Sequence, residues 1–147
     1  MRILIINGPN LNMLGRRDPE HYGTQTLESI EQALSQQARE LDCEVAFFQS
    51  NHEGAIIDFI QQETSASSGI LINPGALTHY GYSLHDALVD SGLPVVEVHL
   101  SNIAAREDWR QQSVIADATI KQVTGFKAES YRLGLAALVN HIRSQSQ

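Results

Sequence analysis

Short apolar segments alternate with amphipathic segments along this chain of 147 residues. Four of the apolar segments, at 3–6, 45–48, 70–72 and 95–100, are rich in β-branched or aromatic residues, and a weaker fifth covers 119–123. Near-continuous apolar strands are typical of parallel sheets that are buried on both faces. Their alternation with helical patterns predicts an α/β fold.

The segments between the predicted strands have the three- and four-residue spacing of helices that cover a sheet. The clearest apolar stripe consists of Leu27, Ile30, Leu34, Ala38 and Leu41. Thr26 precedes this stripe and is a suitable N-cap. Shorter helical patterns cover 56–63 and 84–89. The last pattern places one apolar face on Tyr131, Leu135, Leu138 and Ile142.

Five strands in a chain of this length favour a single domain, 1–147. We expect a flavodoxin-like, doubly wound, five-stranded parallel sheet in the order 2-1-3-4-5, with helices on both faces. Ligands of such sheets bind beyond the carboxyl ends of the strands, near the switch between strands 1 and 3. The segments 7–23, 73–82 and 99–110 should therefore converge on one rim.

The segment 8–25 is too long to be a simple connector. Loops beyond about 12–15 residues in compact domains are usually lids or binding loops. This one follows the first strand and places Tyr22 five residues after Arg17. We predict that it is an active-site lid.

Composition and charge narrow the classes of partner. The formal net charge is −7 and the sequence pI is near 5.2, whereas nucleic acids and anionic membranes favour basic surfaces. No apolar run approaches the 18 or more residues of a membrane span, and no leader is expected before the first strand. The single Cys43 excludes an internal disulfide and fits a reducing compartment. We expect a cytoplasmic protein.

The side chains that we select from the converging segments offer amides, imidazoles, guanidiniums and a phenol. They are Asn10, Arg17, Tyr22, Asn73, His79, His99, Ser101, Arg106 and Arg110, with His85 and Asp86 in the helix that follows. This set has no lysine and no clear metal cage. It suits proton transfer on a polar, anionic molecule.

Tyr22 is a candidate general base if its phenol loses its proton near neutral pH. A guanidinium about 4 Å away at an effective dielectric of about 20 supplies about 4 kcal/mol. Arg17 could provide this stabilisation if the loop folds it onto Tyr22. The alternative is that Tyr22 anchors the loop and Arg17 is a solvated surface charge.

His99 ends a predicted strand, where an imidazole can face the cleft and donate a proton. The alternative is a buried histidine whose hydrogen bonds are only structural. Leu100 and Ser101 offer backbone N–H groups and a hydroxyl to a carboxylate. Arg106 and Arg110 would share a face if their segment is helical, although arginines at that spacing often form a solvated face.

Several other motifs are absent from the sequence. It contains no phosphate-binding loop and no Gly-x-Gly-x-x-Gly, so nucleotide binding has no direct support. The segment 81–85 begins like a nucleophile elbow but has His85 where the second glycine should stand. The histidines lack the spacing of a helical zinc pair, so we expect no metal. Without a rim lysine, carbonyl chemistry should pass through an enolate rather than an imine.

Four ordered sequence blocks resemble type II 3-dehydroquinate dehydratases, over nearly the whole chain. The most specific block reads Asn7-Gly8-Pro9-Asn10-Leu11-Asn12, followed by Leu14-Gly15, Arg17, Pro19 and Tyr22-Gly23. The others are Gln49-Ser50-Asn51-His52-Glu53-Gly54, Ile72-Asn73-Pro74-Gly75-Ala76, and His99-Leu100-Ser101-Asn102-Ile103 with Arg106-Glu107. The resemblance implies a cofactor-free lyase in the third step of the shikimate pathway, which converts 3-dehydroquinate to 3-dehydroshikimate.

The resemblance also implies a role for each site residue. Tyr22 would be the base, Arg17 would keep it ionised, and His99 would be the acid of an anti elimination. Asn10 would hold a water that stabilises the enolate. The resemblance assigns the carboxylate site to Asn73, Leu100 and Ser101, and the ring-hydroxyl site to His79 and Arg110.

The family assembles as a dodecamer built from trimers, in which Asp86 matches a residue that reaches a neighbouring site. Departures from the family pattern are Asp18, Ala55, Ala104 and Lys127, none of which replaces a catalytic candidate. Two alternatives stay open: another polyhydroxy carboxylate as substrate, or a binding module without activity. The sequence does not distinguish aromatic biosynthesis from quinate breakdown.

Overall fold

The computed structural model describes residues 1–146, which form an all-parallel five-stranded sheet in the order β2-β1-β3-β4-β5. The strands are β1 (Arg2–Asn7), β2 (Glu44–Gln49), β3 (Gly69–Asn73), β4 (Val95–His99) and β5 (Lys121–Thr124). The predicted flavodoxin-like α/β fold and its strand order are confirmed.

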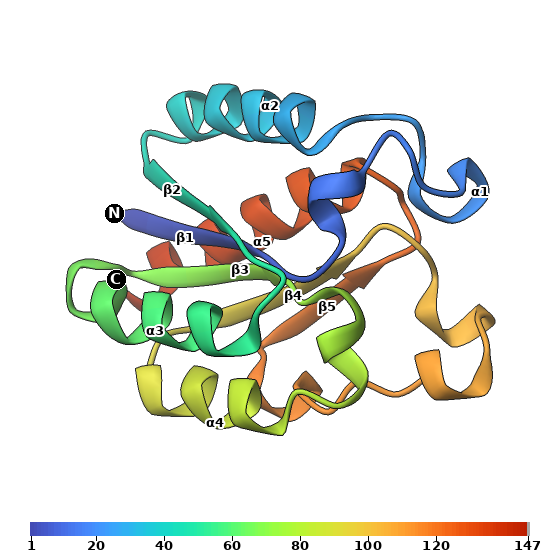
Figure 1. Ribbon diagram of the computed structural model, residues 1–147. Coiled ribbons are helices and arrows are strands. Elements are labelled where there is room, and N and C mark those ends of the chain that lie inside the picture. The colour runs from blue at the N-terminus through green and yellow to red at the C-terminus, as the bar shows by residue number, and fades with distance from the viewer. Residues whose placement is uncertain (147) are drawn as a thin grey trace.

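Helices cover both faces of this sheet (Figure 1). They are α1 (Pro19–Tyr22), α2 (Leu27–Glu40), α3 (Glu53–Glu63), α4 (Tyr82–Ser91) and α5 (Glu129–Gln145). Alternate strand residues point to opposite faces, so Ile3 and Ile5 pack under α2 and α5, whereas Leu4 and Ile6 pack under α3 and α4. The two cores that result place every buried strand between two apolar layers.

Helix α2 starts where the sequence predicts, whereas α3 and α4 start before their apolar patterns at 56–63 and 84–89. Thr26 caps α2 as predicted, since its hydroxyl accepts a hydrogen bond from the N–H of Ser29 at 3.1 Å. At the start of α4, Glu53 of α3 accepts a hydrogen bond from the N–H of Leu84 at 3.0 Å. This cross-helix cap explains why α4 begins two residues before its apolar pattern.

The fifth strand begins later than predicted. The short 3₁₀ turn Ala116–Ala118 ends at Thr119, and the side chain of Ile120 is exposed although its N–H donates to the carbonyl of Val95. The ladder to β4 therefore starts at Lys121 and runs to Thr124.

The predicted lid, 8–25, is folded rather than extended. It contains a 3₁₀ turn at Leu11–Met13, whose Leu11 lies in the core, and the one-turn helix α1. Asp18 caps α1 by accepting a hydrogen bond from the N–H of Glu20 at 3.0 Å. Lys127, named above as a departure from the family pattern, adopts a left-handed φ of 51°. Two of the family departures thus sit at positions with a defined backbone role.

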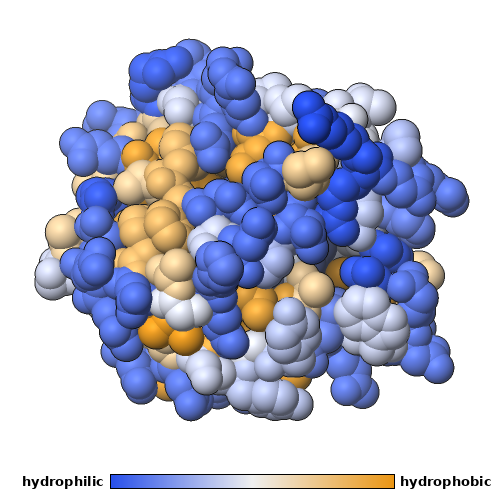
Figure 2. All heavy atoms as spheres, in the orientation of Figure 1, coloured by the Kyte–Doolittle hydropathy of each residue, from blue (hydrophilic) through white to orange (hydrophobic). Residues whose placement is uncertain are grey.

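Polarity differs between the two ends of the molecule. Figure 2 shows apolar side chains over β2 and α3, and hydrophilic ones around the lid. Phe48 of β2 and Phe59 of α3 stack there with ring centroids 4.4 Å apart. No helix in residues 1–146 has the length and apolar composition needed to cross a bilayer.

Candidate active site

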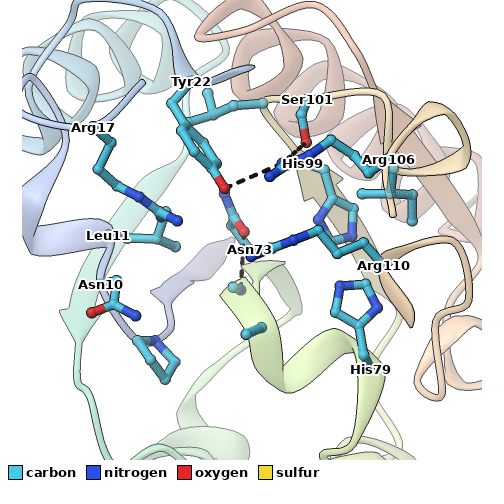
Figure 3. Close-up of a pocket in the computed structure, with 15 residues that line it drawn as sticks. Asn10, Leu11, Arg17, Tyr22, Asn73, His79, His99, Ser101, Arg106 and Arg110 are labelled. Atoms are coloured by element: carbon cyan, nitrogen blue, oxygen red, sulfur yellow. Dashed lines mark hydrogen bonds between the residues drawn. The ribbon is translucent and has the colours of Figure 1, made fainter. Parts of the chain in front are cut away.

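A pocket of about 560 Å³, including solvent at its mouth, opens at the carboxyl ends of β1, β3 and β4. All three predicted segments contribute to it (Figure 3). Its lining consists of Pro9, Asn10, Leu11, Arg17, Tyr22, Asn73, Gly75, Ala76, His79, His99, Leu100, Ser101, Ile103, Arg106 and Arg110. Every predicted site residue except Asp86 therefore lies at this pocket.

Two arginines contact Tyr22 in different ways. The guanidinium carbon of Arg17 lies 3.8 Å from the centroid of the Tyr22 ring, so Arg17 covers the ring face. Arg106 donates a hydrogen bond from Nη1 to the phenol oxygen at 3.2 Å. Arg17 folds onto Tyr22 as the sequence suggested, but the direct contact with the oxygen comes from Arg106.

Arg106 is well placed to hold the lid against the rest of the site. Its side chain is 9% exposed, and the same Nη1 also donates to the hydroxyl of Ser101 at 3.2 Å. Arg106 and Arg110 do not share a helical face, because their segment forms separate 3₁₀ turns at Ile103–Ala105 and Asp108–Arg110 instead of one helix. Both arginines nevertheless face the same pocket.

His99 ends β4, and its Nε2 lies 2.5 Å from a carboxylate oxygen of Glu97. Glu97 is fully buried, and its other oxygen accepts a hydrogen bond from Ser113 at 2.9 Å. The Glu97 contact occupies Nε2 and leaves Nδ1 as the ring nitrogen available to a ligand. Glu97 was not among the predicted site residues, although a carboxylate two residues before His99 on an apolar strand must share its face.

A buried chain of hydrogen bonds fixes Asn73. Its Nδ2 donates to the Tyr131 hydroxyl at 3.0 Å, which donates to Oδ1 of Asn7 at 2.5 Å, and its Oδ1 accepts from the N–H of Gly75 at 3.1 Å. Burial raises the pKa of Tyr131 well above its ordinary value, so this hydroxyl stays a neutral donor. Tyr131 was predicted only as an apolar helix residue, because its partners lie far away in the sequence.

His79 and Arg110 form the opposite wall. Nδ1 of His79 lies 2.7 Å from the carbonyl oxygen of Gln112, so it donates there and leaves Nε2 as an acceptor. Burial lowers the pKa of His79 below its ordinary value of 6.5, which favours this neutral ring. Nε of Arg110 donates to Glu107 at 2.8 Å, and this contact holds the pKa of the Glu107 carboxyl below its usual range.

Asn10 lines the pocket, and its backbone has a left-handed conformation with a φ of 69°. The side-chain oxygen of Asn51 accepts a hydrogen bond from its N–H at 3.0 Å. The sequence block 49–54 thus supports the lid, a role that sequence spacing did not indicate.

Asp86 lies on α4, away from the pocket, and its side chain is 79% exposed. Its neighbour His85 contacts Asp86 at 3.2 Å through Nδ1 and Asp117 at 2.8 Å through Nε2. The hydrogen bond to Asp86, with support from Asp117, raises the pKa of His85. Asp86 therefore does not line the pocket of its own chain. In residues 1–146, no three His, Cys, Asp or Glu side chains gather into a metal-binding group.

The model of the family described as "Dehydroquinase class II" matches residues 1–139. The chain belongs to this family. A 3-dehydroquinate dehydratase from Halothermothrix orenii is 55% identical over 145 residues, which cover 99% of this chain and 98% of the relative. One from Bacillus subtilis strain 168 is 51% identical over 144 residues, with 98% and 97% covered.

Solved structures of class II dehydroquinases agree with this assignment. A crystal structure of a type II dehydroquinase from Butyrivibrio crossotus superposes with a TM-score of 0.91 at 41% identity, and covers 94% of this chain and 97% of that one. The type II dehydroquinase from Propionibacterium acnes gives 0.90 at 39% identity, with 95% and 96% covered. The family resemblance drawn from the sequence is confirmed.

Proposed function

We propose that this chain dehydrates 3-dehydroquinate to 3-dehydroshikimate, the third step of the shikimate pathway, by an anti elimination through an enolate. Tyr22 takes a proton from C2, and His99 protonates the hydroxyl that leaves C1 as water. The C2 proton goes to the phenolate, and the products are a conjugated enone and water. The arrangement that carries this proposal is a phenol on the lid and a carboxylate-bound imidazole lining the same pocket.

The contacts of Tyr22 support its role as base. A phenolate accepts a charge-assisted hydrogen bond from Arg106 that is stronger than the bond a neutral phenol accepts. Arg17 adds a second positive charge over the ring. Both guanidiniums favour the form of Tyr22 that can remove a proton.

The contacts of His99 support its role as acid. Glu97 holds Nε2, so a doubly protonated ring presents its transferable proton on Nδ1. The buried carboxylate balances the charge of that imidazolium. Loss of the proton to the departing hydroxyl leaves the ring in the tautomer that Glu97 already binds.

The remaining lining residues suit the rest of the substrate. The second Nδ2 hydrogen of Asn73, with the backbone N–H groups of Leu100 and Ser101, can bind the carboxylate. His79 and Arg110 can bind ring hydroxyls, and Asn10 can hold a water beside the enolate oxygen.

The deciding experiment adds 3-dehydroquinate and follows the ultraviolet absorbance of the conjugated enone. Tyr22→Phe and His99→Ala should each lower turnover by at least about a hundredfold with the fold retained, the lower range for a lost general base or acid. No signal from well-folded wild-type protein would reject the reaction. Near-normal rates in both variants would reject the assigned roles.

A dodecamer built from trimers is part of the same proposal. Tyr82 and Asp86 are four residues apart on α4 and are both exposed, and we propose that this mixed aromatic and acidic face contacts a neighbouring subunit. Strand β2 lies at one edge of the sheet, and we propose that it offers a second contact surface. Light scattering should give twelve times the chain mass, and a monomer at working concentration would contradict this part.

A further inference from the structure

Trp109 contacts His79 and Arg110, the two candidates for binding the ring hydroxyls, but does not line the pocket itself. Its ring is covered by the guanidinium of Arg110, whose carbon lies 4.0 Å from the ring centroid. Its ring also meets that of His79 edge-on, with centroids 5.2 Å apart and planes at 85°. The indole of Trp109 therefore contacts both His79 and Arg110, which together form the proposed hydroxyl-binding wall. Both side chains reach the pocket in Figure 3.

These contacts leave Arg110 with few conformations. Glu107 accepts its Nε hydrogen at 2.8 Å, and Trp109 covers one face of the guanidinium. An arginine held both at an edge and on a face is pre-organised, so it loses less conformational freedom when a ligand binds. Its terminal nitrogens stay directed at the pocket.

His79 is restrained in the same way. The carbonyl of Gln112 fixes Nδ1, and the edge contact with Trp109 limits rotation of the ring. The acceptor Nε2 is therefore held toward the pocket while Arg110 supplies donors beside it. A donor and an acceptor fixed side by side match a pair of hydroxyls on one ring.

We propose that Trp109 is a positioning residue, which orders Arg110 and His79 to bind the ring hydroxyls of the substrate. The inference rests on the proposed function for the identity of that substrate. Because Trp109 touches no reacting atom, its contribution is to binding in the ground state and the transition state alike. Such a contribution changes KM and leaves kcat nearly constant.

The kinetic test compares Trp109→Ala with Trp109→Phe, which keeps an aromatic face. Loss of the cation–π contact and of the ordering it provides should raise KM for 3-dehydroquinate about fivefold in the alanine variant, with kcat within about twofold. Trp109→Phe should restore most of the affinity. The matched control is Leu133→Ala, which removes an exposed apolar side chain on α5. This variant should leave KM and kcat unchanged.

Three kinetic outcomes would overturn the proposal. They are an unchanged KM in Trp109→Ala, an equal loss in Trp109→Phe, and a fall in kcat with lower thermal stability at constant KM. The last is the result of a purely structural role.

A second measurement does not depend on turnover. Trp109 is the only tryptophan of the chain, so emission excited at about 295 nm reports on this wall alone. Titration with quinate, which keeps the ring hydroxyls of 3-dehydroquinate and has a further hydroxyl in place of the ketone, should change the emission saturably, and Arg110→Ala should abolish the change. No change in the wild type overturns the inference, whereas a change without turnover of 3-dehydroquinate rejects the proposed reaction and keeps the positioning role.

Discussion

The two guanidiniums that contact the phenol of Tyr22 come from different parts of the chain. Arg17 belongs to the lid and travels with Tyr22, whereas Arg106 belongs to the loop after β4. An open lid would keep the Arg17 contact and lose the hydrogen bond from Arg106. We therefore predict that formation of the proposed base is coupled to closure of the lid, because a phenolate would gain its strongest partner only when the pocket is covered.

Glu97 should matter to the proposed acid although it touches no ligand. Glu97→Gln keeps the size of the side chain but removes the charge opposite His99. Hydrogen bonds to charged groups contribute about 1.5–3 kcal/mol, so kcat should fall about 10- to 100-fold. Rates across pH, with urea unfolding as the control for stability, check this. A pH profile identical to wild type would show that Glu97 does not tune the acid.

Two histidines should titrate on opposite sides of the ordinary value of 6.5. Burial lowers the pKa of His79, and the hydrogen bond to Asp86 raises that of His85. Protonation of His79 thus opposes folding as pH falls below 6.5, whereas the ion pairs of His85 weaken as pH rises above it. Imidazole NMR signals, assigned with His79→Gln and His85→Gln, measure both midpoints. The reverse order would contradict the described contacts.

At the scale of elements, the loops after β1 and β3 are interlocked. A Cβ on Gly8 would lie 2.2 Å from the carbonyl oxygen of Pro74, and one on Gly75 would lie 2.8 Å from that of Pro9. The N–H of Gly8 also donates to the carbonyl of Asn73 at 2.8 Å. The pocket floor therefore requires glycine at both crossings.

Gly8→Ala should force these loops apart. Overpacking against backbone costs about 1–3 kcal/mol of unfolding free energy, and the displaced Asn10 and Asn73 should also lower activity. Gly54→Ala is the control: its added Cβ meets nothing within 4 Å, and alanine in α3 should stabilise by about 0.5–1 kcal/mol. Urea denaturation compares the two variants. Equal stability would show that the loops yield without cost.

Strand and helix positions were predictable where one periodicity covers a whole element. The apolar runs of β1 to β4 and the stripe of α2 need no distant information. The 3₁₀ turns around Arg106 and Arg110 have no such period, so the sequence left open whether this segment is helical. The start of α4 was missed because its cap is a side chain of another helix, Glu53 of α3.

At the scale of the molecule, the lid should respond to ligand. Arg16 is exposed and Arg17 half-buried on Tyr22, so trypsin should release an N-terminal fragment at this loop when the lid opens. Saturating quinate should slow that release at least several-fold by holding the lid shut. Mass spectrometry of the fragment follows the rate, and cleavage at Lys121 serves as the internal reference. Equal rates with and without quinate would refute closure.

The residues that line the site were predictable from the sequence, but the hydrogen bonds between them were not. Topology alone brings the ends of β1, β3 and β4 together, which is why most predicted residues line one pocket. The partners within it, Arg106 for Tyr22 and Tyr131 for Asn73, are 84 and 58 residues apart in sequence. Side-chain direction across such separations depends on packing that no local pattern encodes.

Tyr131 belongs to α5, the last element of the fold, yet it fixes the ends of β1 and β3 from beneath. A ribosome delivers the lid, the sheet and both arginine-bearing turns before it delivers this helix. A nascent chain that stops before α5 therefore has all the groups that would touch substrate and lacks the anchor that orders them. We expect the pocket to become ordered only after the first turn of α5, which carries Tyr131, has been synthesised.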